Sequence, residues 1–277
     1  TSYVVGSVRC VQETDIKYTS IFSITAMLII AGCSDNSMDQ EVAAAESGPV
    51  SYYNQFVPCV AGPDASPENM RKMIAEWNEL EAMSDDLVWG GGYSPKGDNN
   101  GQDNGWWEIQ WTSKEAADAG WEVWMASEEA QAWDLKTDAV LACDNSVVSS
   151  WKFTMPGAES PDFDMSYFAT ETHPCNLNDG KTSADLMAVA KKYDNWVTEN
   201  GTADGYYYGI YEALDDDAMF DFLWLNFHQT FEGLDAANSN FVQIGADMQA
   251  SFDEVASCRA PDLYDSYEFR NLMSDAS

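Results

Sequence analysis

Positive charge is scarce in this sequence, which has 13 lysines and arginines against 47 aspartates and glutamates, and a net charge of −34. Such a field repels phosphate backbones and anionic lipid headgroups, so it excludes nucleic-acid binding and charge-driven docking on membranes as leading functions. The acidic stretch Asp215-Asp216-Asp217 lacks the alternating ligand spacing of an EF-hand loop. We therefore interpret the excess acid as a solvated shell.

Histidine and the common catalytic motifs are scarce as well. Only His173 and His228 occur, and there is no glycine-rich phosphate loop, no His-Glu-x-x-His, no Ser-His-Asp arrangement and no Cys-x-x-Cys. No cofactor is therefore expected, and no motif indicates an enzyme. The run Gly90-Gly91-Gly92 predicts a flexible loop and not a nucleotide-binding turn.

Aromatic residues are abundant by contrast, with 11 Trp, 13 Tyr and 12 Phe, and 45% of the residues are hydrophobic. This much apolar surface fills a core, so a globally disordered chain is excluded. The length of 277 residues suits one large domain or two small ones.

A short apolar run near the N-terminus predicts export. The run follows Lys17 and ends in the order Ile-Ala-Gly before Cys33, and it is too short to span a bilayer comfortably. This ending resembles the lipobox of bacterial lipoproteins, which implies that Cys33 is lipidated. In that family, the absence of Asp at the next position, here Ser34, implies sorting to the outer membrane.

The resemblance divides the N-terminal region into three parts. Residues 16–33 are expected to be the signal peptide with its lipobox, and residues 1–15 an upstream leader or a mis-called start. Residues 34–49 are rich in Ser, Asp, Glu and Ala, which is typical of a flexible tether. We expect a membrane-anchored lipoprotein in the periplasm or at the outer membrane, with the membrane as its partner through the lipid.

The other cysteines indicate that the remaining chain is one module written twice. Cys59 and Cys143 are 84 residues apart, and Cys175 and Cys258 are 83 apart. With an offset of 116, the Pro-Cys pair that ends at Cys59 falls on the pair that ends at Cys175. Four cysteines allow three pairings, and the duplication favours the disulfides Cys59–Cys143 and Cys175–Cys258 in an oxidising compartment.

Each copy has the same predicted order of elements: a strand, a helix, two strands, a second helical region and a last strand. This β-α-β-β-α-β order is the ferredoxin-like plan, whose sheet has helices on one face and leaves the other face bare. We therefore expect an α+β fold of two tandem ferredoxin-like domains, residues 50–155 and 162–272, packed sheet to sheet.

The plan resembles the dimeric α+β barrel superfamily, here as an intramolecular pseudo-dimer of fused repeats. Two stretches also resemble marine bacterial lipoproteins, namely the Cys-x4-Gly-Lys stretch from Cys175 to Lys181 and the Gly-Trp-x2-Trp stretch from Gly120 to Trp124. The second resemblance implies export and no particular activity. Haem enzymes of the barrel superfamily use a His on a helix, and both histidines here lie on predicted strands.

The predicted third strands sort by parity into two faces. One face is apolar and is expected to lie under the helices: Trp107, Ile109 and Trp111 in the first copy, and Leu223, Leu225 and Phe227 in the second. The opposite face mixes aromatic and polar groups and is expected to look into the space between the sheets. Its candidate ligand-binding residues are Trp106, Glu108, Gln110, Phe222, Trp224, Asn226 and His228.

Three functional hypotheses follow. The leading one is not enzymatic: binding of a small apolar or aromatic molecule, or a scaffold role. The second is a cofactor-independent monooxygenase with His228 as general base near Asn226 and Trp224. The third is a metal-dependent enzyme that uses His173 and His228, with Glu171 or Asp221 as a third ligand. The sequence leaves open the ligand, the oligomeric state, and whether the space between the sheets is a cavity or solidly packed.

Overall fold

The computed structural model describes residues 50–101, 104–156, 163–201 and 205–272. The predicted leader, signal peptide, lipidated Cys33 and tether lie outside the described residues. Among the described helices, none is long and apolar enough to cross a membrane. The described residues between 50 and 272 belong to one compact unit.

The two copies contain matching elements. The first half consists of β1 (Ser51–Ala61), α1 (Pro67–Glu79), β2 (Leu87–Pro95), β3 (Gly105–Trp111), α2 (Lys114–Ala126), α3 (Glu128–Thr137), β4 (Leu141–Cys143) and β5 (Ser149–Thr154). The second half consists of β6 (Phe168–Leu177), α4 (Ser183–Asn200), β7 (Tyr206–Ala213), β8 (Phe222–His228), α5 (Phe231–Ile244), α6 (Ala246–Val255), β9 (Ala256–Cys258) and β10 (Asp262–Asn271).

Side-chain caps explain where most of the helices begin. Ser66 precedes Pro67 at the first turn of α1 and accepts a hydrogen bond from a backbone N–H of that turn. Thr182 forms a reciprocal capping box with Asp185 at the start of α4. Ser127 ends α2 and caps α3, so the predicted second helical region of the first half is two helices.

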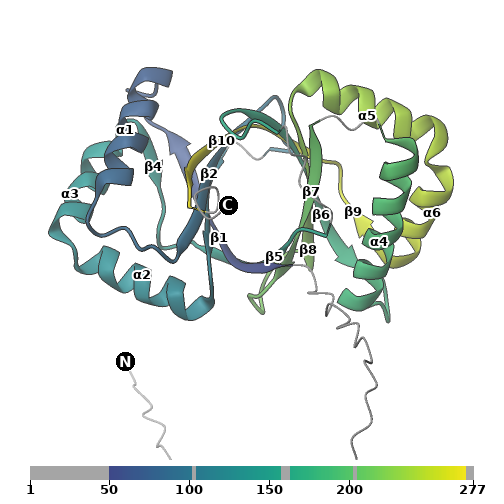
Figure 1. The fold of residues 1–277 in the computed structure, drawn as a ribbon. Helices are drawn as coiled ribbons and strands as arrows, with labels where there is room; N and C mark the ends of the chain where they lie inside the picture. The colour runs from purple at the N-terminus through teal and green to yellow at the C-terminus, as the bar shows by residue number, and fades with distance from the viewer. Residues whose placement is uncertain (1–49, 102–103, 157–162, 202–204, 273–277) are drawn as a thin grey trace, which may run out of the picture. The chain divides into compact units, whose positions relative to one another are not determined.

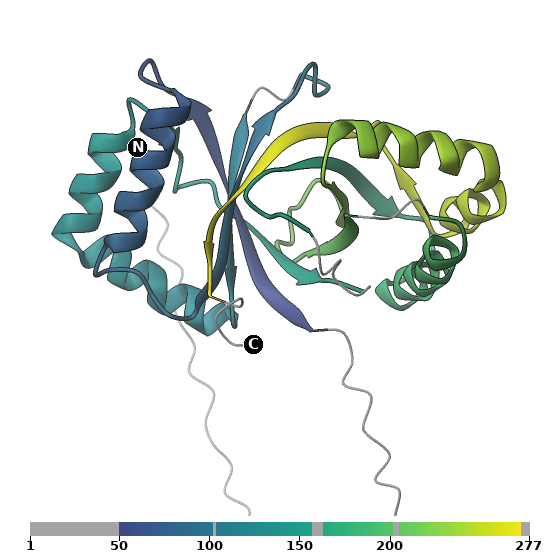
Figure 2. The same cartoon turned by 45° about the horizontal axis from the view of Figure 1, so that its top comes forward.

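The two sheets join edge to edge and close into one barrel. The strand order is β10-β2-β3-β1-β5-β7-β8-β6, and β6 pairs again with β10. Ladders β5–β7 and β2–β10 connect the halves. Figure 1 shows the barrel between the helices of the first half and those of the second, and Figure 2 shows β10, in yellow, running along the strands of the first half. The predicted α+β pseudo-dimer is confirmed. Its two sheets are joined by backbone hydrogen bonds between strands at both edges.

Both predicted disulfides are confirmed. Cys59 is bonded to Cys143, and Cys175 to Cys258. In each half the two cysteines lie directly opposite each other, on the pairs β1–β4 and β6–β9. Each disulfide therefore ties the end of the first strand of its half to the short strand that follows the last helix.

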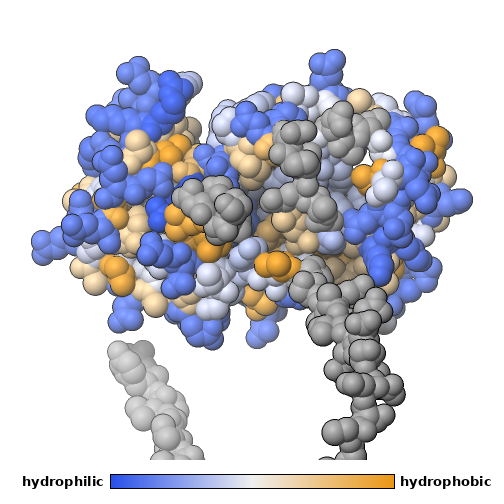
Figure 3. Space-filling view, in the orientation of Figure 1, coloured by the Kyte–Doolittle hydropathy of each residue, from blue (hydrophilic) through white to orange (hydrophobic). Residues whose placement is uncertain are grey.

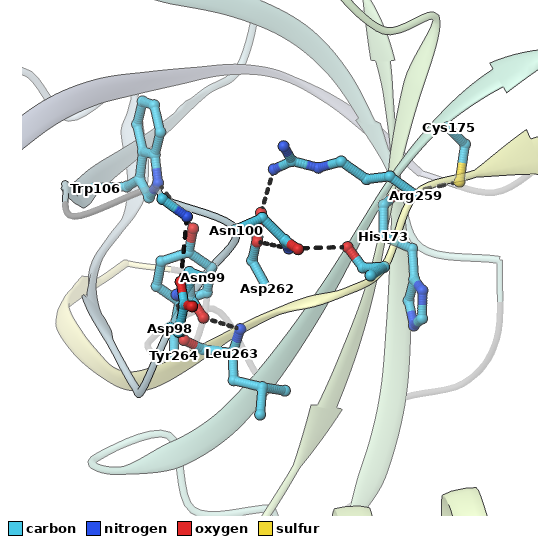
Figure 4. A network of polar contacts seen from close by, with 12 residues as sticks. Asp98, Asn99, Asn100, Trp106, His173, Cys175, Arg259, Asp262, Leu263 and Tyr264 are labelled. Atoms are coloured by element: carbon cyan, nitrogen blue, oxygen red, sulfur yellow. Dashed lines mark hydrogen bonds and ion pairs between the residues drawn. The ribbon is translucent and has the colours of Figure 1, made fainter.

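A loop of the first half also docks on β10. The Asn99 side chain donates to the carbonyl of Leu263 at 2.8 Å and accepts from its N–H at 2.9 Å. Asn100 donates to Asp262 at 2.8 Å, and Arg259 forms an ion pair with the same carboxylate. Figure 4 shows these contacts together, and they reinforce the β2–β10 connection between the halves.

The triple glycine is part of a strand, so the predicted loop is wrong. All three residues lie in β2. A Cβ at Gly91 would lie 2.1 Å from the ring of Trp89, and one at Gly92 would lie 2.1 Å from the ring of Phe269. Glycine is needed here because large aromatic rings cover the backbone, and not because the segment must be flexible.

The barrel interior is filled mainly by aromatic side chains from both halves. The buried cluster there consists of Phe56, Trp89, Tyr93, Trp151, Phe153, Phe168, Tyr207, Tyr211, Leu225, Phe227 and Tyr264. Rings from different halves pack together, as Phe56 and Tyr211 do with centroids 5.4 Å apart. The space between the sheets is therefore a packed core.

The predicted faces are confirmed on β3 and wrong on β8. Trp107, Ile109 and Trp111 pack under the helices of the first half. In the second half, however, Leu225 and Phe227 lie in the barrel cluster, so the helices cover the opposite face of β8. One extra residue in the chain before β8 causes this exchange, because it changes which residues of the predicted strand fall on each face.

The register shows where the shift arises. Cys59 lies opposite Gly105, and Cys175 lies opposite Phe222. The offset between the halves is 116 from Cys59 to Cys175, and 117 from Gly105 to Phe222. The second half therefore has one more residue between its first cysteine and its third strand.

The surface agrees with the interpretation of the charge. On the face drawn in Figure 3, hydrophilic side chains cover most of the described surface, and apolar side chains are scattered between them. Exposed large hydrophobic residues such as Leu135 and Val242 lie on different helices. Such isolated residues are normal on a soluble surface.

Candidate functional site

A cavity of about 290 Å³ lies in the second half, between the outer face of the sheet and helices α4, α5 and α6. Strands β6, β7 and β8 supply its polar floor, and the helices supply mostly aromatic walls. Mostly apolar concave sites with a few convergent polar groups are typical of small-molecule binding.

Glu171 is the centre of the polar floor. It is 4% exposed and accepts hydrogen bonds from Asn226 on β8 at 3.0 Å and from Asn238 on α5 at 2.9 Å. His173 Nε2 lies 3.1 Å from the same carboxylate. Burial alone would raise the pKa of Glu171, but the hydrogen bonds and the charge of His173 outweigh it, so the pKa lies below its usual value. Glu171 is therefore an ionised, buried carboxylate.

A chain of hydrogen bonds orients the groups around Asn226. Its side-chain oxygen accepts from the Trp224 indole at 2.9 Å and from the Tyr206 hydroxyl at 3.0 Å. The Tyr206 hydroxyl also lies 2.9 Å from the hydroxyl of Tyr193. Since these contacts hold the Asn226 amide in one orientation, its nitrogen faces Glu171.

His228 is the group in the cavity without a polar partner. Its side chain is buried, with 5% exposure, and its ring lies 4.7 Å from that of Tyr206. Within the described residues, its imidazole makes no hydrogen bond. Burial lowers the pKa of His228 to about 4, against the opposing effect of Glu171, so the ring is neutral at pH 7. A neutral imidazole presents one donor and one acceptor to the cavity.

The aromatic wall is built around Tyr193 on α4. Its ring stacks on Trp196 at 6.1 Å and lies edge-on to Trp224, Phe241 and Phe252 at 5.5, 6.3 and 5.6 Å. Trp196 and Phe241 lie 5.1 Å apart. These contacts hold the rings in place, so the cavity presents a rigid aromatic surface.

The first half has a corresponding cavity that is nearly filled. Its volume is about 60 Å³, and six tryptophans line it: Trp77, Trp107, Trp111, Trp121, Trp124 and Trp133. The two halves share a backbone plan, so the difference in volume comes from the side chains at matching positions.

Two matching positions on the sheet differ in polarity. Gln55 lies opposite Ile109 in the first half, and Glu171 lies opposite Asn226 in the second. Gln55 accepts hydrogen bonds from the indoles of Trp111 and Trp121 at 3.1 and 2.7 Å. The second half therefore has a carboxylate where the first has a neutral amide, and an amide where the first has an apolar side chain.

Both histidines occupy positions that are apolar in the first half. Val57 corresponds to His173, because each lies two residues before the first cysteine of its half. Trp111 corresponds to His228, because each ends the third strand and pairs with the matching position of the first strand. The smaller imidazole leaves open the space that an indole occupies in the first half.

The predicted ligand-binding residues divide between two places. Trp106, Glu108 and Gln110 belong to the barrel side of the first half, where Trp106 donates to Tyr264 at 3.2 Å and Gln110 donates to Glu108 at 2.9 Å. Phe222, Trp224, Asn226 and His228 line the cavity of the second half. The prediction that all seven face one space is wrong, because of the one-residue shift in β8; ligand binding by the last four stays a prediction.

The two histidines do not share a metal site. His173 lies opposite Trp224 and His228 lies opposite Ala169, four positions along the ladder. At about 3.3 Å per residue this separates the two backbones by about 13 Å along the ladder. Side chains that leave the same face of a sheet so far apart do not converge on one zinc ion, whose nitrogen ligands lie about 2 Å from the metal.

The suggested third ligands have other contacts. Glu171 is bonded to His173, while Asp221 accepts from the backbone N–H of Leu177 at 2.8 Å. The described part of the chain contains no group of three or more His, Cys, Asp or Glu side chains that could hold a metal ion.

Sequence reasoning missed the helix residues of the site. The sequence places Tyr193 only on an apolar helix face, and Asn238 is not among the predicted site residues. Asn238 lies four residues after the buried Leu234 and three before Phe241, so helical spacing places it on the covered face of α5. A polar residue on the covered face of a helix was the sequence signal that could have identified Asn238 as a site residue.

Comparison with protein families finds no match, and comparison with curated protein sequences finds none either. Solved structures do match. A provisionally assigned chlorite dismutase has a TM-score of 0.50 at 8% identity, over 79% of this chain and 96% of that one. A heme-binding protein from Thermus thermophilus has 0.46 at 10%, over 82% and 96%. Chlorite dismutase from Candidatus Nitrospira defluvii has 0.48 at 10%, over 78% and 90%. At these identities the likeness concerns the fold alone, which is an α+β barrel.

A haem group does not fit the side chains of the cavity. Haem carries two propionates, and the described lining contains no Lys or Arg but does contain the carboxylates of Glu171 and Asp253. The described helices also contain no His, so a helical iron ligand is absent from this part of the chain. The charge of the site therefore opposes a dianionic porphyrin.

Proposed function

We propose that the protein binds a small aromatic molecule in the cavity of the second half. The aromatic part packs against Tyr193, Trp196 and Phe241, and a polar group forms a hydrogen bond with His228. The observation that carries the proposal is the His228 imidazole, which has no hydrogen-bond partner among the described residues and lines a cavity of about 290 Å³. A mostly apolar cavity with a polar group that is free to form a hydrogen bond is typical of a small-molecule site.

The expected affinity for a single-ring probe is modest. Burial of about 150 Å² of apolar surface contributes about 4 kcal/mol, and one hydrogen bond adds about 1 kcal/mol. We take the free-energy cost of the ligand's lost translation and rotation as offset by its packing contacts in the cavity. The net binding free energy of about −5 kcal/mol then corresponds to a Kd of about 0.1–1 mM. A larger natural ligand that fills the cavity would bind more tightly.

A binding role is favoured over the monooxygenase hypothesis. Trp224, Asn226 and His228 do lie together on one wall of the cavity. A general base works best when its pKa is near the working pH, and the pKa of His228 is lowered to about 4. His228 is therefore a weak base at neutral pH, but it still accepts or donates a hydrogen bond.

Filling the cavity tests the proposal. Ala237 on α5 lines the cavity, and its neighbour Ala236 is exposed and does not. With 2-phenylethanol as the probe, followed by tryptophan fluorescence, we expect Ala237→Leu to weaken binding at least tenfold. Ala236→Leu, the matched control, leaves binding unchanged. Equal binding by wild type and Ala237→Leu, with a normal melting temperature, would show that the cavity is not the site.

We also propose that the protein is an exported lipoprotein with its two repeats, residues 50–155 and 162–272, held at the membrane through Cys33. The apolar run before Cys33 and the two disulfides, which require an oxidising compartment, support this. Expression of the full chain in bacteria with labelled fatty acid tests it. We expect label on the wild type and none on Cys33→Ser; an unlabelled wild type would contradict lipidation.

A further inference from the structure

We propose that the molecule bound in this cavity is a protonated aromatic amine, whose ammonium group is held between Glu171 and His228. The inference rests on the proposed binding function and adds the charge of the ligand to it. It starts from the contrast between the buried carboxylate and the absence of Lys and Arg in the described lining.

The charge of Glu171 is only partly balanced by the protein. Asn226 and Asn238 are neutral donors, and His173 carries a charge only when it is protonated. The His173 side chain is 28% exposed, whereas that of Glu171 is 5% exposed. A buried carboxylate whose only charged partner is one half-buried imidazole still attracts a second cation.

The carboxylate also has an acceptor position to spare. An ionised carboxylate offers about four acceptor positions. Oε2 of Glu171 accepts from Asn226 and lies against His173, while Oε1 accepts from Asn238 alone. One position on Oε1 is therefore open to a donor from the ligand.

His228 is the neighbour that completes the site. Glu171 lies opposite Asn226, and His228 is two residues further along the same face of β8, so Glu171 and His228 are diagonal partners. Diagonal partners are about 7–8 Å apart at the backbone. An ammonium group between the two side chains can donate to both, since a neutral imidazole has one free lone pair.

The walls suit the rest of such a molecule. Tyr193, Trp196 and Phe241 line the cavity, so a flat apolar body there would contact aromatic rings, and such rings attract a nearby positive charge. The net charge of −34 raises the local concentration of cations and lowers that of anions. The aromatic walls, the Glu171 carboxylate and the negative net charge of the protein therefore all favour a protonated aromatic amine.

The first half is an internal comparison. At the position of Glu171 it has Gln55, and at that of His228 it has Trp111. The nearly filled cavity of the first half thus has no carboxylate at this position, and its amide oxygen is occupied by two indoles. The buried charge is present in the half that has room for a ligand.

Three matched probes test the inference: 2-phenylethylamine, which is a cation at pH 7, neutral 2-phenylethanol and anionic phenylacetate. On the full chain, titration calorimetry should show the amine binding at least tenfold more tightly than the alcohol, and phenylacetate more weakly than either. Glu171→Gln should bring the affinity for the amine to within threefold of the affinity for the alcohol on the same variant.

Glu254→Gln is the control for net charge. Glu254 is on α6, is paired with Lys181 and does not line the cavity, so this variant should keep the tenfold preference for the amine. Wild type that binds the amine no better than the alcohol overturns the inference and leaves the binding function intact. If none of the probes binds, the proposed function fails and the inference with it. If Glu171→Gln does not fold, the ratio of amine to alcohol on wild type decides.

Discussion

Glu108 in the barrel core makes the stability of the protein depend on pH. The side chain is 0% exposed and accepts hydrogen bonds from Tyr211 at 2.8 Å, from Gln110 at 2.9 Å, and from Tyr93. Burial raises the pKa of Glu108 from 4.5 to about 7, against the opposing effect of these hydrogen bonds. Tyr211 belongs to the second half, so this carboxyl group links the two repeats across the barrel.

Proton linkage gives the direction in which the free energy of unfolding changes with pH. Between pH 4.5 and 7 the folded protein keeps a proton on Glu108 that the unfolded chain has released, so the stabilising contribution is fully present below pH 4.5 and is lost as the pH rises through 7. The shift corresponds to about 3 kcal/mol in total, of which about 2.5 kcal/mol lies between pH 5 and 8.5.

The perturbation is Glu108→Gln, which keeps the shape of the side chain and removes the titration. Urea unfolding of both proteins, with disulfides intact, gives the free energy of unfolding from pH 5 to 8.5. Because the other carboxyl groups are common to both, the difference between wild type and variant isolates Glu108. We expect this difference to fall by about 2.5 kcal/mol as the pH rises. A difference that stays constant with pH would refute the reasoning.

Three other changes should alter the free energy of unfolding in the same assay. Replacing Cys59 and Cys143 together by serine should lower it by about 2–5 kcal/mol, because an 84-residue loop is released; no loss would contradict this. Gly120→Ala should lower the free energy of unfolding by about 1–3 kcal/mol, since the added carbon lies 2.4 Å from an indole ring. Gly233→Ala is the control and should cause no loss, because its added carbon lies 3.5 Å from the nearest neighbour. Equal effects of the two substitutions would refute the packing argument. Thr182→Ala should cost about 1 kcal/mol by removing the capping box, and an unchanged midpoint would count against that cap.

The repeat, the disulfides and the barrel were predictable because they depend on features with long-range spacing. The cysteines are matched in number, neighbours and separation, so they identify equivalent ends of strands whatever lies between them. The element order then indicates the ferredoxin-like plan, since a half-sheet with one bare face needs a partner.

The direction of the side chains on β8 was not predictable from alternation. Leu225 and Phe227 on one side and Phe222 and Trp224 on the other are all buried, because a barrel strand under helices has two covered faces. Alternation indicates the inner face of a strand only where one face is polar. The single extra residue between Cys175 and β8 therefore changed the faces without a sign in the sequence.

The cavity could not be predicted from the sequence either. Its volume depends on which side chains fill the space between the sheet and the helices, and that depends on how the helices lie on the sheet. Once the register is known, the matching positions explain the difference: Trp111 fills the space in the first half, and His228 leaves it open in the second.

The central claim is that only the second half of the chain has an open binding site, and indole NMR tests it most directly. Trp196 and Trp224 line the open cavity, whereas Trp107 and Trp133 fill the corresponding space in the first half. With ¹⁵N-labelled indoles, assigned through single Trp→Phe variants, addition of 2-phenylethanol should shift the signals of the first pair and not those of the second. Shifts in the second pair alone, or in neither pair at saturating probe, would contradict the account.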